Sequence, residues 1–295
     1  MNPAFRIKMA KRRGEQIAKE QGVNTLPVDP FEIAEDHNIM VQAKPNTETG
    51  VSGMLLRHGD TFGILYATHI PSLGFQRFSV AHELGHYFID GHPEHIFPED
   101  GVHESRAGFV SSDIYELEAD NFAAGLLMPG QLFKREMNKH SAGLDAILLL
   151  ADKCVTSLTA TAIRFAELSE DAIAVIVSTG PNVDYCMLSE TMKLLPGLSF
   201  IRKGSAVPTS TLTAVFNRDP EAALSARRDE QSIDIQDWLG GSKSKPAHEE
   251  VIGLGGYGKT LTIVTCPGLV EAGYEDDDDD DEEDLEARWT PKFHR

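Results

Sequence analysis

Two histidines and a glutamate in the stretch RFSVAHELGHYFIDGH, residues 77–92, are the side chains best suited to catalysis. His82 and His86 are four positions apart, so a helix would place both imidazoles on one face with the carboxylate of Glu83 beside them. This HExxH spacing is typical of a zinc site with its own general base. The flanking residues are uncharged, which predicts a buried helix, and a buried His, Glu and His cluster needs a partner charge such as Zn²⁺.

A catalytic zinc normally has three protein ligands and a water, so a third ligand is expected. His92 stands where the HExxHxxGxxH pattern has its third histidine, but Ile89 occupies the place of the glycine that turns the chain back. Glu116, in YELEADNFAAGLLMP, is the better candidate, because Asp120 faces the same way one turn later and can accept the second ring N–H of a ligand histidine. Glu118 lies about 200° around the helix and is expected to face solvent or to support the site from outside.

This ligand set favours peptide-bond hydrolysis. Zinc would lower the pKa of a bound water and polarise the carbonyl, while Glu83 would take the proton and pass it to the leaving amine. Two histidines and a carboxylate also suit Mn²⁺ or Fe²⁺. A donor for the oxyanion is expected as well. The sequence leaves that role open among Tyr87, His92, His95, His103 and Tyr115.

The elements that must position these residues are mostly helical up to residue 170. Apolar periodicity and turn residues predict a β-hairpin around residues 58–60, and helices at 3–21, after Asp29-Pro30, at 76–89, in 113–129, in 130–140, in 143–155 and in 157–168. Beyond residue 170 short β-rich runs follow, separated by Gly, Pro and Asn: AIAVIVSTG, YCMLSE, SFIRKG, TAVFN and TLTIVTC.

We therefore predict an α+β protein in four parts. They are a metallopeptidase domain at residues 1–140, a helical, helix-turn-helix-like connector at 141–170, a smaller α+β domain of regulatory or substrate-binding role at 171–274, and a tail at 275–295. The tail contains EDDDDDDEEDLE and is expected to be disordered by its composition.

Charge and composition restrict the partners and the compartment. The formal net charge is −19, and the only basic cluster lies between Arg6 and Lys19, which argues against general affinity for nucleic acid. No apolar run is long enough to cross a membrane, and the first residues lack the apolar core of a signal peptide, so a cytoplasmic protein without membrane contact is expected. The three cysteines indicate neither a disulfide framework nor a zinc ribbon.

Two further motifs are weaker. GLGGYGKT, Gly253 to Thr260, has the letters of a phosphate-binding loop, but the residues after it are β-rich, so a glycine-rich turn between strands and no nucleotide are predicted. Residues 148–168, LLLADKCVTSLTATAIRFAEL, have the sequence pattern of a helix-turn-helix: an apolar helix, a short turn and a second helix. Lys153 and Arg164 are nearly its only cations, so direct DNA binding is not expected, and docking of a repressor is the alternative.

RFSVAHELGHYF followed by ELEADNFAAGLLMP resembles the paired motifs of the ImmA/IrrE family of bacterial and phage regulatory metallopeptidases. The resemblance implies a gluzincin-like fold for the first domain, zinc ligands His82, His86 and Glu116, and Glu83 as catalytic acid/base. It also implies a substrate, a helix-turn-helix transcriptional repressor whose cleavage relieves repression in stress responses or in phage and mobile elements. Two other classes stay open: a non-catalytic, zinc-stabilised module that binds a repressor or toxin, and a DNA-binding regulator.

Overall fold

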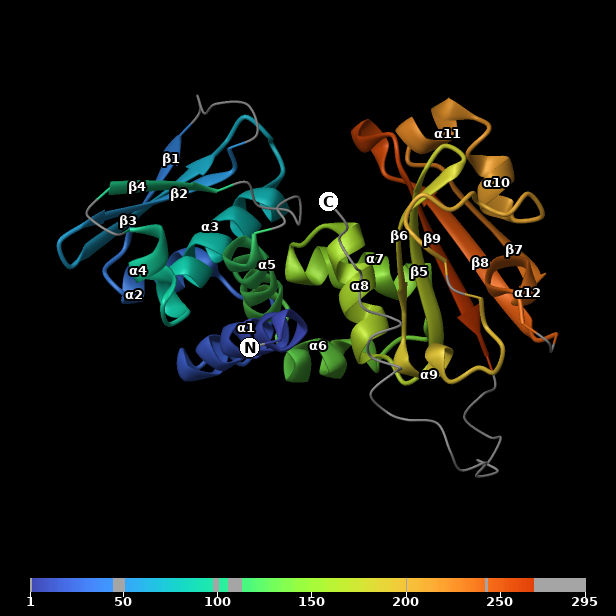
Figure 1. The fold of residues 1–295 in the computed structure, drawn as a ribbon, viewed down its shortest axis with the longest axis horizontal. Helices are drawn as coiled ribbons and strands as arrows, with labels where there is room; N and C mark the ends of the chain where they lie inside the picture. Colours follow the sequence, from blue (N-terminus) through green and yellow to red (C-terminus); the bar gives the residue numbers. More distant parts are fainter. Residues whose placement is uncertain are drawn as a thin grey trace. The chain divides into compact units, whose positions relative to one another are not determined.

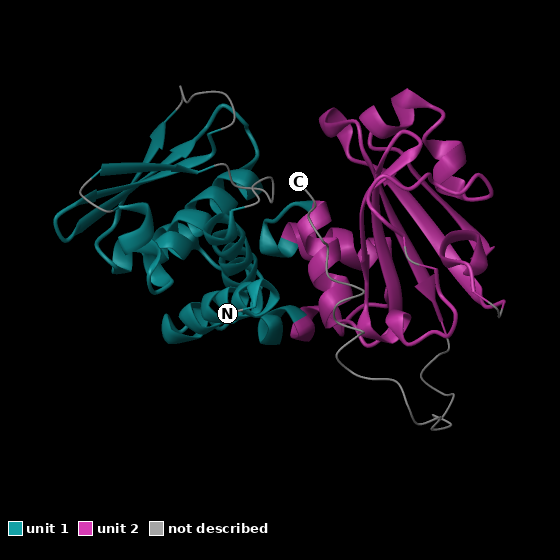
Figure 2. Ribbon diagram, viewed as in Figure 1, with its two compact units in different colours: residues 1–133, 153–157, 274–295 teal, residues 134–152, 158–273 magenta. Residues whose placement is uncertain are grey.

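The computed structural model describes residues 2–44, 51–97, 101–105, 113–199, 201–241 and 244–267. The acidic tail predicted at 275–295 lies outside these residues. The chain divides into two compact units (Figure 2). Among the described residues, unit 1 comprises residues 2–133 and Lys153–Ser157, and unit 2 comprises Lys134–Asp152 and residues 158–267. Helix and sheet occur in both units, as the predicted α+β class requires.

Two helices of unit 1 cross at glycines. Helix α1 (Pro3–Glu20) begins with Asn2 as its cap and proline at its first position, and it packs on α5 (Ile114–Leu127). A Cβ added at Gly14 would lie 2.2 Å from the carbonyl oxygen of Phe122, and one added at Gly125 would lie 2.1 Å from that of Lys11. The two backbones therefore touch where no larger residue fits.

A four-stranded sheet completes unit 1. Its order is β1-β3-β2-β4, with β1 parallel to β3 and the other pairs antiparallel. The strands are β1 (Met40–Lys44), β2 (Gly53–His58), β3 (Thr61–Ala67) and β4 (Gly101–Ser105). The hairpin predicted around residues 58–60 is confirmed as β2 and β3, and the helix predicted after Asp29-Pro30 is α2 (Pro30–Asp36).

The motif helix α3 (Leu73–Phe88) lies between this sheet and α5 (Figure 1). It begins three residues earlier than predicted, because the side chain of Ser72 accepts the N–H of Phe75 and caps the helix there. Gly85 permits the approach to α5, since a Cβ at that position would lie 3.0 Å from the Cα of Ala119. A short helix, α4 (His92–Ile96), follows.

Unit 2 is built on a five-stranded antiparallel sheet of order β6-β5-β9-β8-β7. The strands are β5 (Ala172–Thr179), β6 (Asn182–Leu188), β7 (Arg228–Asp234), β8 (Pro246–Gly253) and β9 (Thr260–Cys266). Helices α7 (Leu144–Cys154) and α8 (Leu158–Leu168) lie on one side of the sheet (Figure 1). Three short helices lie on the other side: α10 (Leu212–Phe216), α11 (Pro220–Leu224) and α12 (Gln236–Leu239). Helix α6 (Gly130–Met137) precedes them and crosses the boundary between the units. Strand β5 is buried along almost its whole length, which explains its continuous apolar run.

Some of the predicted strands beyond residue 170 are wrong. TAVFN is helical, in α10 (Leu212–Phe216), because Thr211 caps it and the buried carboxylate of Glu249 accepts the N–H groups of Leu212 and Thr213. Residues 201–204 of SFIRKG form no strand. Strand β7 was missed, because its sequence RDEQSID is polar and its side chains are mostly exposed at the sheet edge.

Several short elements complete unit 2. They are α9 (Glu190–Lys193), α11 (Pro220–Leu224), α12 (Gln236–Leu239) and a 3₁₀ turn at Gly255–Tyr257. The glycine-rich stretch from Gly253 to Thr260 is the turn between β8 and β9. Within the described part of the chain, no single helix is long and apolar enough to cross a membrane; α7 and α8 meet that criterion only as a pair bent by 113°.

Candidate metal centre

Helices α3 and α5 bring three potential metal ligands together. His82 and His86 face the first turn of α5, where Glu116 stands. The Nε2 atoms of the two histidines are 3.2 Å apart, and they lie 3.4 Å and 3.2 Å from the two carboxylate oxygens of Glu116. Ligand atoms about 2.1 Å from a tetrahedral zinc are separated by about 3.4 Å. The spacing of the three side chains therefore fits a bound ion.

The electrostatics of this triad also call for a cation. Burial lowers the pKa of His86 to about 3. Burial also disfavours a charge on His82, but hydrogen bonds to Asp120 and Glu116 outweigh it and raise the pKa of His82 to about 10. Despite its partial burial, Glu116 has a pKa well below its usual range, because His103, His82 and His86 donate to it. The triad thus contains one anion and favours a positive charge beside it, which a metal ion would supply in place of a proton.

Each ligand histidine has a different partner behind it. The Nδ1–H of His82 donates to Asp120 Oδ1 at 2.8 Å, the contact expected of a metal-bound imidazole. The Nδ1 of His86 instead lies 3.1 Å from the Nδ1 of His92. His92 is 1% exposed and stands behind the triad, so it is not a member of the ligand group.

Glu118 supports His92 from α5. Its Oε2 accepts the Nε2–H of His92 at 3.0 Å, and both of its oxygens accept from Arg6, at 2.7 Å and 2.6 Å. Since Glu118 is 5% exposed, the expectation that it could face solvent is wrong, and the expectation of a supporting role fits. The sequence did not point to Arg6, because it lies 112 residues away from Glu118 and only the packing of α1 on α5 joins them.

Glu83 is fully buried, and neither of its carboxylate oxygens has a hydrogen-bond partner among the described residues. Burial raises the pKa of Glu83 to about 7. The charges of His82 and His103 act to lower this pKa, and so does the nearby hydroxyl of Ser105, although it falls short of hydrogen-bond geometry. Gly53 makes room for this side chain, because a Cβ there would lie 2.4 Å from Glu83 Oε1. A buried carboxylate without partners is rare, and it has the pKa of a general base near neutral pH.

The five candidates for an oxyanion donor occupy different surroundings. His103, on β4, donates from Nε2 to Glu116 Oε1 at 3.1 Å, and its side chain is 21% exposed. Tyr115 stacks on His95 with ring centroids 3.8 Å apart, and Tyr87 packs edge-on against Phe62. His92 is buried behind His86. His103 is therefore the candidate that both touches the triad and retains access to solvent.

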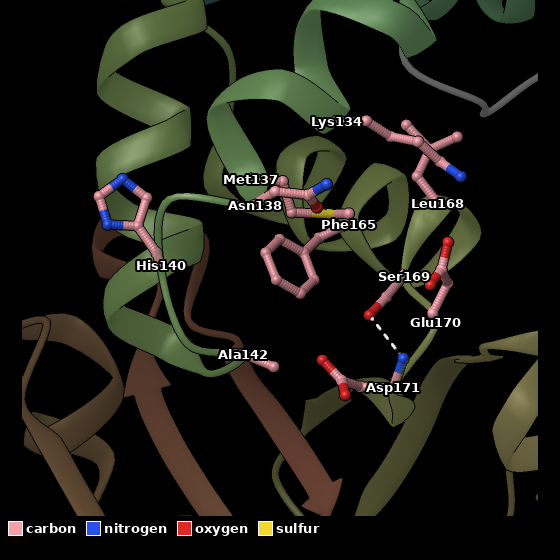
Figure 3. A pocket seen from close by; sticks show the side chains of 10 residues that line it. All are labelled: Lys134, Met137, Asn138, His140, Ala142, Phe165, Leu168, Ser169, Glu170 and Asp171. Atoms are coloured by element: carbon pink, nitrogen blue, oxygen red, sulfur yellow. Dashed lines mark hydrogen bonds between the residues drawn. The ribbon is translucent and has the colours of Figure 1, made fainter. Parts of the chain in front are cut away.

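Two other features belong to unit 2. A cavity of about 320 Å³, with Lys134, His140 and Asp171 at its rim, contains none of the predicted site residues (Figure 3). Glu230, His248 and Glu250 also lie close enough together to hold an ion, but Glu230 is 69% exposed and Glu250 accepts the backbone N–H of Leu144. Neither feature combines ligands with a buried base.

Comparison with known proteins places the triad in a recognised domain. Residues 34–165 match the model of the IrrE N-terminal-like domain, a peptidase family. A Mycobacterium tuberculosis transcriptional regulator of known structure is similar over 87% of this chain and 76% of its own, with a TM-score of 0.56 and 16% identity, which is a likeness of fold. No curated protein matches. The resemblance predicted from the two motifs is confirmed over residues 34–165, which match this IrrE-type peptidase family.

Proposed function

We propose that the protein is a zinc-dependent endopeptidase that cleaves a helix-turn-helix transcriptional repressor at one site and so relieves repression. The observation that carries this proposal is the buried carboxylate of Glu83, which has no hydrogen-bond partner in the described part of the chain and lies beside the triad of His82, His86 and Glu116. A metal that only stabilised the fold would not require a buried base next to it.

The side chains of the site have different roles in hydrolysis. Zn²⁺ held by the triad would activate a water and polarise the scissile carbonyl. Glu83 accepts the proton of the attacking water and delivers it to the amine as the C–N bond breaks, for which a pKa of about 7 is suited. His103 is partly exposed beside Glu116, to which its Nε2 donates in the structure; we assign this N–H to the developing oxyanion once Glu116 serves as a metal ligand.

The nature of the substrate rests on the family. The resemblance implies a repressor as the target, and the solved structure of similar fold is itself named as a transcriptional regulator. Direct DNA reading by α7 and α8 has less support, although their 113° bend is of the helix-turn-helix kind. Arg164 is 4% exposed and pairs with Glu167, so it does not serve as a phosphate contact.

The test is to incubate the zinc-loaded protein with the helix-turn-helix protein encoded beside it and to analyse the products by intact mass spectrometry. We expect one discrete cut, absent with Glu83→Gln and absent after chelation. Native metal content, measured by elemental analysis of protein purified without added metal, distinguishes Zn²⁺ from Mn²⁺ and Fe²⁺. A repressor that stays intact but forms a stable complex with both proteins would favour the non-catalytic binding module.

A further inference from the structure

We infer that His92, Glu118 and Arg6 form a positioning relay that fixes His86 as a metal ligand and thereby sets the affinity of the centre for its ion. The inference rests on the proposed function only in that the triad holds a metal, and it does not require that a peptide is cut. Arg6 lies outside residues 34–165, so the family match does not cover one end of this relay.

The direction of each hydrogen bond follows from metal binding. When Nε2 of His86 offers its lone pair to the ion, the ring proton must sit on Nδ1 and is donated to Nδ1 of His92, 3.1 Å away. His92 then carries its own proton on Nε2, which faces Glu118 Oε2 at 3.0 Å. In the opposite tautomer of His92, a lone pair would face the carboxylate, and His86 would meet a second N–H.

The far end of the relay is held by two charge-assisted hydrogen bonds. Arg6 donates from Nε and Nη2 to the two oxygens of Glu118 at 2.7 Å and 2.6 Å, which fixes the plane of the carboxylate. Arg6 also lies over the ring of Tyr115, 4.9 Å from its centroid. Glu118 and His92 are 5% and 1% exposed, so the hydrogen bond between them is shielded from water, whereas the side chain of Arg6 is 27% exposed.

The relay connects the metal centre to the packing of a separate helix. His82 is supported by Asp120 on α5, the helix that also provides Glu116, whereas the support of His86 runs through α4 and α5 to α1. Because α1 and α5 touch at Gly14 and Gly125, Arg6 has a defined place relative to Glu118. We therefore expect the centre to bind its metal with full affinity only when α1 is packed on α5.

The experiment measures zinc affinity by chelator competition, without any substrate, for His92→Phe, Glu118→Gln and Arg6→Ala in the full chain. Removal of partners that orient a metal-bound histidine typically weakens metal binding about 10-fold to 100-fold. We expect a loss in that range for His92→Phe, and about tenfold for the other two, with partial recovery in Arg6→Lys. Arg13→Ala is the matched control, because Arg13 lies on the same helix and pairs only at the surface with Glu20 in the contacts described, so zinc affinity should not change.

A positioning role differs from a structural one in two further measurements. The absorption bands of the Co²⁺-substituted protein should shift in His92→Phe and Glu118→Gln, and the melting temperature of the metal-free protein should change less than that of the zinc form. Parental zinc affinity in Glu118→Gln and Arg6→Ala would overturn the relay, even if His92→Phe failed to fold. Weakened zinc binding together with an intact repressor would uphold the relay and count against the proposed protease.

Discussion

Two fully buried glutamates, Glu83 in unit 1 and Glu249 in unit 2, have opposite surroundings. Glu249 accepts five hydrogen bonds, and no oxygen of Glu83 accepts one from the described residues. The donors to Glu249 are Leu212 N, Thr213 N, Thr213 Oγ1, Gln231 Nε2 and Trp238 Nε1, at 2.7 to 3.0 Å. A carboxylate surrounded by donors joins helices α10 and α12 to the sheet. One without donors destabilises the fold and is instead available for proton transfer.

The same isosteric change at both glutamates tests directly whether their surroundings give them different roles. Glu83→Gln should reduce kcat/KM for repressor cleavage by about 10²-fold to 10⁴-fold, because the amide cannot accept a proton. The free energy of unfolding should stay the same or rise, since an unpaired buried charge is removed. Cleavage assays, zinc content and urea denaturation of one preparation test both parts. Parental activity in this variant would remove Glu83 from the mechanism.

Glu249→Gln should have the reverse effect. The new amide group points N–H toward neighbouring N–H donors and leaves some of them unsatisfied, so we expect a loss of about 2 to 4 kcal/mol in the free energy of unfolding. Zinc affinity should not change, because Glu249 lies in unit 2 and contacts none of the ligands. Urea denaturation provides the number. A loss of less than about 0.5 kcal/mol in the free energy of unfolding would mean that an amide satisfies the five donors as well as the carboxylate does.

Asp120→Ala tests a third carboxylate, whose single histidine partner is a ligand of the triad. Without it, His82 loses the acceptor that fixes its tautomer, and zinc affinity should fall about 10-fold to 100-fold. Chelator competition measures the change. The control is Glu20→Ala, which removes an exposed carboxylate from α1 and should leave the affinity unchanged.

The smallest expected effect concerns Asp184, a partly exposed carboxylate of unit 2 that has a cationic partner. Burial acts to raise its pKa, but Lys259 and Thr179 outweigh burial and lower the pKa. A pKa that is lowered in the folded state adds stability above the unfolded value of about 4, and this contribution disappears as the pH falls through the folded value. Between pH 6 and pH 3, the stability advantage of the parent over Asp184→Asn should shrink, by less than about 1 kcal/mol for so exposed a pair. An advantage that grows toward pH 3 would contradict the sign.

The predictable parts of the fold and site were those set by local spacing. His82, Glu83 and His86 occupy little more than one helical turn, and Glu116 and Asp120 occupy one turn of another, so periodicity alone indicated their faces. The helix at TAVFN could not be read in this way, since Glu249, 36 residues from Thr213, holds its first N–H groups. Arg6 was missed for the same reason: its role depends on a pairing of helices, and no pattern in the sequence around it differs from that of a solvated basic face.

The crossing of α1 and α5 at Gly14 and Gly125 has a consequence for how this sequence can change over evolutionary time. Neither glycine touches the triad, yet a single added methyl group at either one would clash with backbone atoms. Backbone atoms cannot move aside by a change of rotamer, as a side chain can. A larger residue at either position cannot be accommodated by a smaller side chain opposite, because each glycine faces a backbone carbonyl. Shape therefore constrains both positions, for a reason that is independent of the chemistry of the metal centre.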